Sequence, residues 1–416
     1  MRILVGGTYY YVRGGAERCL ISLAQLLEAH GHEVIPFSMH HEQNLPTPYD
    51  RFFVSNIDFP TALHADAGIR GKLQVAERVI YSREAKRKMT ELIDAVRPDV
   101  VHLHNIAHEL SPSILPPIRE AKIPVVQTLH DYKLLCPNTS FISNGAVCER
   151  CKGHRYYNAV RYRCKRDSLG ASLLAAAEVY VHNVLGLYER NIDAFIAPSR
   201  FLQEKAAQFG VKTPVVQIPN FIEVDRFEPC YEADDYFVFV GRLVEIKGIF
   251  TLLDAMRGVR TSHLYIAGGG EDEAGAREFA RKEGLDNVTF LGHLSGEQLR
   301  PLVQRARFAV VPSQWYENYP MSVLEAFACG TPVIGADIGG IPELVQENET
   351  GLLFPPGDAV MLREKICYLL ANSAKAAAMG RAGRCHVEKH NSPSRHYAQT
   401  MELYARLRGQ RATAVV

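Results

Sequence analysis

Short apolar runs alternate with segments of helical periodicity along most of the chain. A first series of runs predicts strands at 3–5, 33–37, 100–104, 124–128 and 194–197. A second series predicts strands at 215–218, 236–240, 263–267, 288–291, 308–311 and 332–335. The runs are continuous rather than alternating, which is typical of parallel strands that are buried on both faces. The pattern therefore predicts an α/β protein with two doubly wound domains.

Prolines mark the predicted boundary between the two domains. They gather between Pro198 and Pro229, and the second series of strands begins within this stretch. We expect an N-terminal domain over 1–197 and a C-terminal domain over 198–393. The remaining segment, 394–416, starts with a helix that is a candidate to pack back on the N-terminal domain.

The composition is that of an ordinary soluble enzyme. The chain has 416 residues, a comfortable length for two domains, and 22 % of them are charged. The net charge of +1 gives no global electrostatic reason to expect nucleic acid as a partner. The apolar runs are too short for a signal peptide or a membrane span, so we expect a cytoplasmic protein.

Two glutamates flank the start of a predicted helix near the end of the second series. Pro320 suits the first helical position, and Gly330 ends the helix. Glu317 therefore lies just before the helix, and Glu325 lies more than one turn inside it. The free N–H groups of a helix start bind anions, most often phosphate. Because carboxylates on either side accept hydrogen bonds from hydroxyl groups, the segment predicts a nucleotide-sugar site.

Glycine-containing turns follow several predicted strands, at 14–15, 241–248, 268–270 and 339–340. Each turn alone is weak evidence, and Gly14-Gly15 alone is more often a tight turn. Arg242 and Lys247 leave the same strand end at a spacing suited to a diphosphate. Such cations are more often a solvated surface pair, but the two glutamates downstream favour a binding site.

These motifs together resemble a known family. Gly-Arg-Leu-x-x-x-Lys-Gly at 241–248 and Glu-x7-Glu at 317–325, running into Ala-Cys-Gly-Thr-Pro-Val-Ile, are similar to the retaining glycosyltransferases of family 4. Further matches lie at 14–17, 102–105, 128–131, 197–200 and 219–220. The resemblance covers nearly the whole chain. It implies the GT-B fold, in which two Rossmann-like domains face each other across a cleft.

The resemblance implies a role for each matching side chain. Arg242 and Lys247 would hold the donor diphosphate and stabilise the departing nucleotide. Glu325 would accept hydrogen bonds from the ribose, and Glu317 would contact the hydroxyl groups of the donor sugar. His130 would lie near the reacting sugar, although a histidine at a strand end can equally be bonded to the backbone.

Backbone groups complete the implied donor site. Gly14 and Gly15 would approach the phosphates from the opposite domain. The base would rest on the backbone of Gly292, His293 and Leu294. The sugar or phosphate would contact the backbone of Asn318, Tyr319, Pro320, Met321 and Ser322. Many family members have Gly-Phe-Gly where this chain has Asn318-Tyr319-Pro320, so we expect a bulkier loop.

The implied reaction is metal-independent glycosyl transfer from a UDP- or GDP-sugar, with no cofactor required. The acceptor would be a sugar, a lipid-linked or a small-molecule hydroxyl, in polysaccharide, glycolipid or glycoconjugate synthesis. The loops between Met39 and Lys72 are expected to shape its site. One alternative is a GT-B enzyme of the nucleotide-sugar epimerase type, which would need carboxylates in place of Arg242 and Lys247. Another is a binding scaffold.

An irregular insertion at 136–166 carries a second chemistry. Cys136, Cys148, Cys151 and Cys164 contain one Cys-x-x-Cys pair and resemble the ligands of a structural zinc site. An iron–sulfur cluster lacks the usual spacing. Free thiols or two disulfides are the plain alternatives, and we favour zinc because cytoplasmic thiols stay reduced.

The insertion is also basic and aromatic, and an apolar helix is predicted at 169–188. This combination indicates contact with the cytoplasmic face of a membrane. A solvated loop beside a core helix is the commoner case. A nucleic-acid-binding zinc module would also fit the insertion, but it leaves the rest of the chain unexplained, so we expect no nucleic acid.

Overall fold

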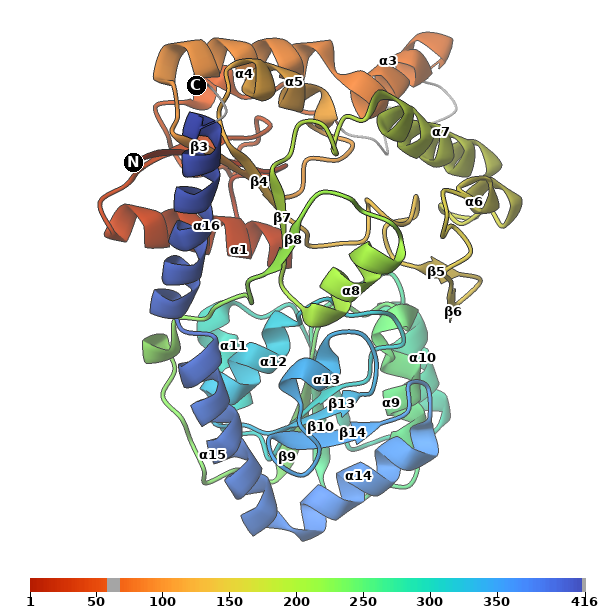
Figure 1. The fold of residues 1–416 in the computed structure, drawn as a ribbon. Helices are drawn as coiled ribbons and strands as arrows, with labels where there is room; N and C mark the ends of the chain where they lie inside the picture. Colours follow the sequence, from red (N-terminus) through yellow and green to blue (C-terminus); the bar gives the residue numbers. More distant parts are fainter. Residues whose placement is uncertain (58–67, 414–416) are drawn as a thin grey trace.

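The computed structural model describes residues 1–57 and 68–413. The chain forms two α/β units, one above the other in Figure 1, and each is built on a six-stranded sheet. All strand pairs within the two sheets are parallel, as predicted. A two-stranded hairpin, β5 (Ile142–Ser143) and β6 (Ala146–Val147), lies in the cysteine-containing insertion.

The first sheet has the order β2-β1-β3-β4-β7-β8. Its strands are β1 (Arg2–Gly6), β2 (Glu33–Phe37), β3 (Val100–Leu103), β4 (Val125–Thr128), β7 (Ala194–Ala197) and β8 (Val215–Gln217). The helices of this part are α1 (Gly15–Ala29), α3 (Gly68–Tyr81), α4 (Arg83–Val96), α5 (Leu115–Glu120), α6 (Tyr157–Arg161), α7 (Leu169–Leu185) and α8 (Arg200–Gln208).

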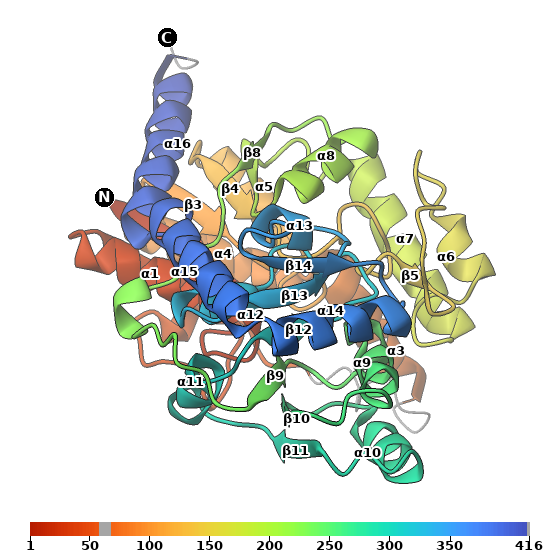
Figure 2. The same ribbon diagram turned by 90° about the horizontal axis from the view of Figure 1, so that it is seen from below.

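The second sheet has the order β11-β10-β9-β12-β13-β14, and its strands lie side by side in Figure 2. They are β9 (Tyr236–Val240), β10 (His263–Ala267), β11 (Val288–Gly292), β12 (Ala309–Val311), β13 (Val333–Ala336) and β14 (Gly351–Phe354). The helices are α9 (Ile249–Met256), α10 (Glu273–Lys282), α11 (Gly296–Gln304), α12 (Met321–Ala328), α13 (Ile341–Leu344), α14 (Ala359–Ala371) and α15 (Ser373–His390).

One strand joins a different sheet from the one predicted. The run at 215–218 was expected to open the second series, but β8 pairs with β7, with Phe195 opposite Val215. That prediction was wrong because an apolar run shows that a strand exists but not which sheet it completes. The first sheet therefore ends at Gln217, and both α8 and β8 belong with it rather than with the C-terminal domain expected over 198–393.

Both faces of the first sheet are buried, which explains its unbroken apolar strands. Successive side chains point to opposite faces. Leu4 accordingly belongs to one core cluster, whereas Ile3 and Val5 belong to another. The second domain has a single large core around its own sheet.

The last helix, α16 (Pro393–Thr413), packs on the first domain, although α15 packs on the second (Figure 1). Tyr404 is fully buried, and its hydroxyl lies 2.6 Å from His102 Nδ1 on β3. The guanidinium of Arg411 donates to Asp193 just before β7, at 2.7 and 2.8 Å. The C-terminal segment thus ties the two domains together.

A buried ion pair anchors α7 to the loop that follows β4. Lys133 Nζ lies 2.6 Å from Glu178 Oε2, and the two side chains are 7 % and 0 % exposed. His108 lies 3.2 Å from the same oxygen. Burial raises the pKa of Glu178, but Lys133 and His108 outweigh it and lower this pKa to about 2.

We expect Glu178→Leu to lower the free energy of unfolding by about 3 kcal/mol, because Lys133 would stay buried without a carboxylate. Since the folded-state pKa of Glu178 is depressed, the pair stabilises the protein above the unfolded pKa. This stabilisation is lost as the pH falls towards the folded value. Thermal unfolding measures both effects. Lys133→Met combined with Glu178→Leu should recover most of the loss, and a single variant as stable as wild type would refute the argument.

Candidate active site

Lys247 and Glu317 meet at the carboxyl edge of the second sheet. Lys247 follows β9, and Glu317 lies in the loop between β12 and α12. Lys247 Nζ donates to Glu317 Oε1 at 2.6 Å, and Ser313 Oγ donates to the same oxygen at 2.6 Å. Glu317 is only 5 % exposed. The fold therefore brings together two residues that were predicted separately for the donor site and that lie 70 positions apart in the sequence.

The charge of Glu317 is maintained by its neighbours. Burial raises the pKa of this carboxyl, but the Lys247 ammonium and the hydrogen bonds from Lys247 and Ser313 lower it by more. The net pKa lies below the usual value, so Glu317 is ionised at neutral pH. A buried carboxylate that is already negative is a strong acceptor for hydroxyl groups.

Arg242 follows the same strand, β9, and its side chain is exposed. Among the described residues, its guanidinium has no hydrogen-bond or ion-pair partner, in contrast to Lys247. An unpaired guanidinium at a strand end is available for an anion. Its predicted role with the diphosphate is compatible with this position.

Helix α12 begins at Met321, one residue later than predicted, because Pro320 is extended with ψ of 118°. No side chain caps this helix start. The backbone N–H groups of Met321 and Ser322 therefore point out of the helix without a capping acceptor, as an anion site requires.

The bulk expected in the loop at 318–320 is turned away from the helix start. The Tyr319 side chain is buried in the core of the second domain, where its hydroxyl accepts a hydrogen bond from Asn391 Nδ2 at 2.9 Å. Asn318 instead reaches the first domain. Its Nδ2 donates to the carbonyl of Leu129 at 2.9 Å, and its Oδ1 accepts from Ser199 Oγ at 2.8 Å.

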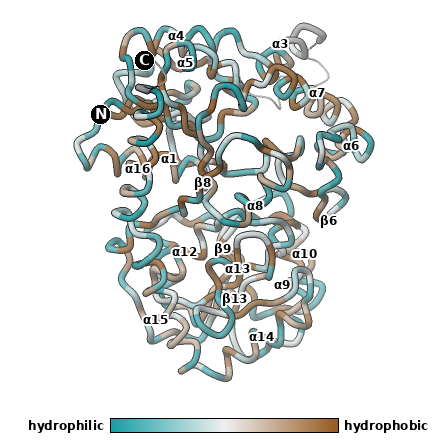
Figure 3. The backbone as a smooth tube through the Cα atoms, in the orientation of Figure 1, coloured by the Kyte–Doolittle hydropathy of each residue, from teal (hydrophilic) through white to brown (hydrophobic). Residues whose placement is uncertain are grey.

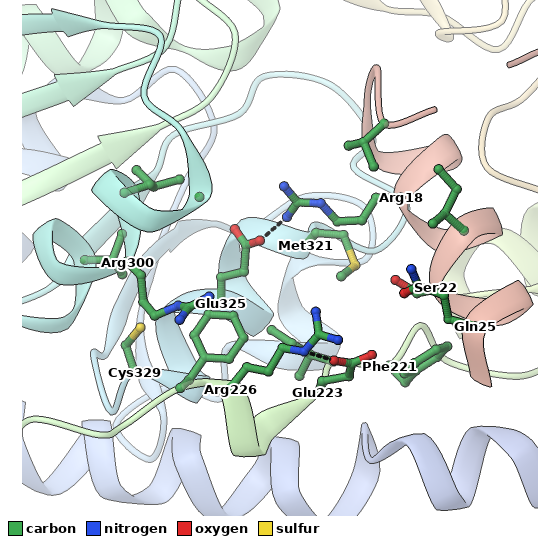
Figure 4. Close-up of a pocket in the computed structure, with 17 residues that line it drawn as sticks. Arg18, Ser22, Gln25, Phe221, Glu223, Arg226, Arg300, Met321, Glu325 and Cys329 are labelled. Carbon is green, nitrogen blue, oxygen red and sulfur yellow. Dashed lines mark hydrogen bonds and ion pairs between the residues drawn. The ribbon is translucent and has the colours of Figure 1, made fainter. Parts of the chain in front are cut away.

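Glu325 faces a cavity of about 360 Å³ between the domains (Figure 4). From the opposite wall, Arg18 on α1 donates to Glu325 Oε1. Burial raises the pKa of Glu325 despite this guanidinium. Arg226 and Arg300 also line the cavity. Arg226 is paired with Glu223, whereas Arg300 has no ion-pair partner among the described residues and is available for an anionic ligand. In this structure, Arg18 is thus hydrogen-bonded to Glu325, the carboxylate that was expected to bind the ribose.

The loop predicted to hold the base leads into the same cavity. Gly292 ends β11 with a φ of 68°, a conformation that favours glycine. His293 is exposed and Leu294 is half-buried. A few residues later, Gly296 at the start of α11 lines the cavity.

His130 lies at the end of β4 in a column of stacked imidazole rings. The centroids of His102 and His104 are 4.9 Å apart, and those of His104 and His130 are 5.0 Å apart. His104 Nδ1 lies 2.7 Å from His130 Nε2. Burial lowers the pKa of His130 to about 4 and that of His102 to about 3. These rings are therefore neutral at physiological pH and act as hydrogen-bonding groups.

His130 faces the second domain across a small cavity that Arg18 and Met321 also line. Its ring is hydrogen-bonded to the ring of His104. The alternative from the sequence was a hydrogen bond to the backbone. Sequence reasoning missed Arg18, Ser313 and the partner role of His104. Arg18 carried a usable signal, because it lies one helical turn after Gly14.

Gly14 and Gly15 form the exposed, uncapped start of α1. A methyl group at Gly15 would meet no atom within 4 Å, and its φ is not positive. By contrast, one at Gly268 would lie 1.9 Å from the carbonyl oxygen of Gly241. The turn at 268–270 thus needs glycine for packing, whereas Gly15 is not needed by the fold and is free to serve a ligand.

We expect Gly15→Ala to leave the melting temperature unchanged but to raise the KM for the donor about tenfold, because the methyl group would crowd the phosphates. Steady-state kinetics and a thermal scan test this. Gly170→Ala is the matched control, since Gly170 also lies in a first helical turn with open space around it. An unchanged KM would show that α1 does not approach the donor.

The four cysteines of the insertion are free thiols in this structure. No cluster of three or more His, Cys, Asp or Glu that could hold a metal ion is found among the described residues. Burial, followed by the neighbouring cysteines, raises the pKa of Cys151 to about 12. Structural zinc stays a prediction that metal analysis of the purified protein would decide.

The predicted acceptor loops between Met39 and Lys72 are described only in part. Residues 58–67 lie outside the described residues, so the prediction is not tested there. In the described part of the chain, no helix is both long and apolar enough to cross a bilayer.

Two family models match adjoining parts of the chain. The model for Glycosyltransferase Family 4 matches residues 13–226, which is about half of the chain, and the model for Glycosyl transferases group 1 matches residues 221–386. Together they span both domains and contain every predicted site residue.

A GDP-mannose-dependent alpha-(1-6)-phosphatidylinositol monomannoside mannosyltransferase of Mycobacterium tuberculosis is 31 % identical over 202 residues. The match covers 43 % of this chain and 52 % of that protein, so the chain spans about half of this relative's length. Sucrose-phosphate synthase from Thermosynechococcus elongatus has a similar fold, with a TM-score of 0.73, 22 % identity and 98 % of both chains covered. Anabaena Alr3699/HepE in complex with UDP has a TM-score of 0.66, 18 % identity, and 97 % and 100 % coverage.

Proposed function

Because the chain belongs to glycosyltransferase family 4, we propose that it moves a sugar from a nucleoside-diphosphate sugar to an acceptor hydroxyl with retention of configuration. The two parallel sheets and the fold neighbours confirm the predicted GT-B fold. The observation that carries the proposal is the Lys247–Glu317 pair beside the uncapped start of α12. It combines groups for a diphosphate with a group for sugar hydroxyls.

The reaction follows from this arrangement. Arg242, Lys247 and the N–H groups of α12 would stabilise the negative charge that collects on the diphosphate as the bond to the anomeric carbon breaks. Glu317 would orient the donor sugar through its hydroxyl groups. The acceptor oxygen would then bond to the anomeric carbon on the face the nucleotide leaves. Its proton would pass to a phosphate oxygen, so no protein nucleophile is needed.

Donor binding would also open the contact between Arg18 and Glu325. The ribose hydroxyl groups would replace the guanidinium on the carboxylate, and Arg18 would face the anionic donor from the first domain. The neighbouring cavity, with Arg226 and Arg300 in its wall, would receive part of the nucleoside.

UDP- and GDP-sugars are the donor classes we favour, since one relative is named as GDP-mannose-dependent and one fold neighbour was solved with UDP. The setting would be polysaccharide, glycolipid or glycoconjugate synthesis. The epimerase alternative is not favoured, because Arg242 and Lys247 stand where it would need carboxylates.

Donor hydrolysis without acceptor tests the proposed chemistry. We expect slow release of nucleotide from one donor class, and NMR of the freshly released sugar should show the anomer that the donor carried. Release of the opposite anomer would contradict retention, and release from no UDP- or GDP-sugar would contradict the donor assignment.

We also propose that the enzyme works at an anionic membrane surface. Helix α7 lies at the side of the molecule away from α16 (Figures 1 and 3). One of its faces is buried, and the other exposes apolar side chains. The exposed side chains are Leu169, Leu173, Tyr180, Val184 and Leu185, of which Val184 is 79 % exposed.

Exposed cations lie in the insertion just before this helix. They are Arg150, Lys152, Arg155, Arg161, Arg163 and Arg166, and none is paired with a carboxylate among the described residues. Apolar side chains beside unpaired cations suit a surface of anionic lipid, because burial of the apolar groups and attraction of the cations to the lipid headgroups both favour binding.

We expect the protein to sediment with vesicles of phosphatidylcholine and phosphatidylglycerol, and to do so less at high salt. Leu173→Ser combined with Val184→Ser should weaken this binding about tenfold without lowering the melting temperature. Val360→Ser is the control, because Val360 is an exposed apolar side chain on α14, far from the basic insertion in sequence. Equal binding to vesicles of phosphatidylcholine alone, or none to either, would contradict the proposal.

A further inference from the structure

Tyr316, which directly precedes Glu317, belongs to the second domain, but its side chain packs in the first domain. Its ring packs against the core cluster of the first domain. The ring centroid is 4.7 Å from that of Phe201, 5.9 Å from Phe141 and 6.3 Å from Tyr132. Three aromatic rings of the first domain therefore form a socket around one ring of the second.

The polar end of Tyr316 is held as firmly as its ring. The Tyr316 hydroxyl donates to Glu149 Oε1 at 2.8 Å, and Lys205 Nζ donates to the same oxygen at 2.6 Å. The Lys205 ammonium also lies 5.3 Å from the centre of the Tyr316 ring. A hydrogen bond to an ionised acceptor and a cation over the ring both stabilise this docked position.

The ionisation states agree with this assignment. Burial raises the pKa of Glu149, but Lys205 and the Tyr316 hydroxyl outweigh it, so the net pKa is lowered. Burial and the Glu149 carboxylate raise the pKa of Tyr316 to about 12. Tyr316 is therefore a donor and Glu149 an ionised acceptor across the neutral range.

The socket is built in part by the insertion at 136–166, which the catalytic argument leaves unused. Phe141 and Glu149 both belong to it, and Glu149 lies between Cys148 and Cys151. Phe201 and Lys205 come from α8, the helix that leads into β8. The insertion thus reaches the loop that carries Glu317, although no insertion side chain contacts Glu317 itself.

The backbone of Glu317 has anchors on both sides. Its carbonyl accepts a hydrogen bond from Gly340 N–H at 2.7 Å within the second domain. The residue before Glu317, Tyr316, is hydrogen-bonded to the first domain, and so is the residue after it, Asn318. Separation of the two domains would break the anchors at Tyr316 and Asn318 and leave the backbone hydrogen bond from Gly340.

We propose that Tyr316 is a positioning residue whose docking couples domain closure to the placement of Glu317. The docked ring lies in the socket of Tyr132, Phe141 and Phe201, and its hydroxyl is held by the Glu149–Lys205 pair. This inference rests on the proposed transferase function, in which Glu317 contacts the donor sugar. The cysteine-containing insertion then serves the reaction by building the far half of the closed site.

The test weakens the contact from either side, because Tyr316→Phe removes the donor and Glu149→Gln removes the negative charge of the acceptor. We expect each variant to lower kcat about tenfold, as loss of a hydrogen bond to a charged group does, with the donor KM within twofold of wild type. The double variant should lose little more than either single variant, because both remove the same contact. Tyr368→Phe and Glu349→Gln, at exposed sites on the second domain, are the controls.

Trp315 gives a readout that needs no turnover. It is the only tryptophan in the chain, it is half-buried, and it adjoins Tyr316. We expect iodide to quench its fluorescence more strongly in Tyr316→Phe and Glu149→Gln than in wild type or the controls. If quenching rises but wild type turns over no nucleotide-sugar, the docking holds and the proposed function fails. Unchanged kcat and quenching, or a matching loss of melting temperature and nucleotide binding, would overturn the positioning role.

Discussion

Replacing Lys247 with alanine is expected to lower kcat/KM for the donor by about 10³- to 10⁴-fold, in the range of losses for cations that stabilise phosphoryl charge. Two effects combine. The variant lacks a cation where negative charge collects on the diphosphate, and it leaves Glu317 buried without its counter-ion. Steady-state kinetics with the identified donor measures the loss.

The same substitution should move the acid limb of the pH profile. In wild type, Lys247 and Ser313 hold the pKa of Glu317 below its usual value against the effect of burial. Without Lys247, burial dominates and the pKa rises. Activity that requires ionised Glu317 is present above the pKa and lost below it, so the acid limb shifts to higher pH. Lys282→Ala, at an exposed cation, should change neither the rate nor the profile, and an unshifted limb in Lys247→Ala would contradict the assigned pairing.

Glu317→Ala is expected to lower kcat by about 10³-fold while binding of the free nucleotide changes little. Glu317 is assigned to the donor sugar, whereas Arg242, Lys247 and the start of α12 are assigned to the nucleotide. Removing the carboxylate also frees Lys247 for the diphosphate, so nucleotide affinity should not fall.

Kinetics with the sugar donor and calorimetry with the nucleotide alone separate these two effects. Glu349→Ala is the matched control, because Glu349 is exposed and has no ion-pair partner among the described residues. A variant that keeps more than a tenth of wild-type kcat would remove Glu317 from the reaction. A binding scaffold would show no effect on either measurement.

The parallel sheets were predictable because their strands are unbroken apolar runs buried on both faces. Val100-Val101 and Val125-Val126 show the pattern most clearly, and both runs are fully buried. The sheet to which β8 belongs was not predictable, since its pairing with β7 depends on how α8 packs between the two strands in the chain. The local composition carries no information on that packing.

The site was predictable where motifs lie close in sequence and obscure where the fold brings distant residues together. Glu317 and Glu325 flank the start of one helix, so their spacing alone indicates a site. The contact of Arg18 with Glu325 joins residues 307 positions apart. Tyr319 illustrates another limit, because its sequence position suggested bulk beside the donor, whereas the core of the second domain takes its side chain.

The cysteine-containing insertion shows that residues without a motif can matter as much as those with one. Its thiols predict a structural zinc site, which stays a prediction, and no cluster that could hold a metal ion is found among the described residues. The contact that reaches the active-site loop is made by Glu149, within the Cys-x-x-Cys pair, and by Phe141. Neither residue carries a motif, and both matter because α8 and the insertion meet beside Tyr316.

The central claim is that Arg242, Lys247 and the start of α12 bind the diphosphate of a nucleotide-sugar without a metal. Thermal shift of wild type and Lys247→Ala with UDP, GDP, ADP and CDP, each with and without magnesium, tests it most directly. We expect one nucleotide to raise the melting temperature of wild type equally in both conditions, and the shift to be lost in Lys247→Ala. No shift with any nucleotide in folded wild-type protein, or a shift that requires magnesium, would contradict the claim.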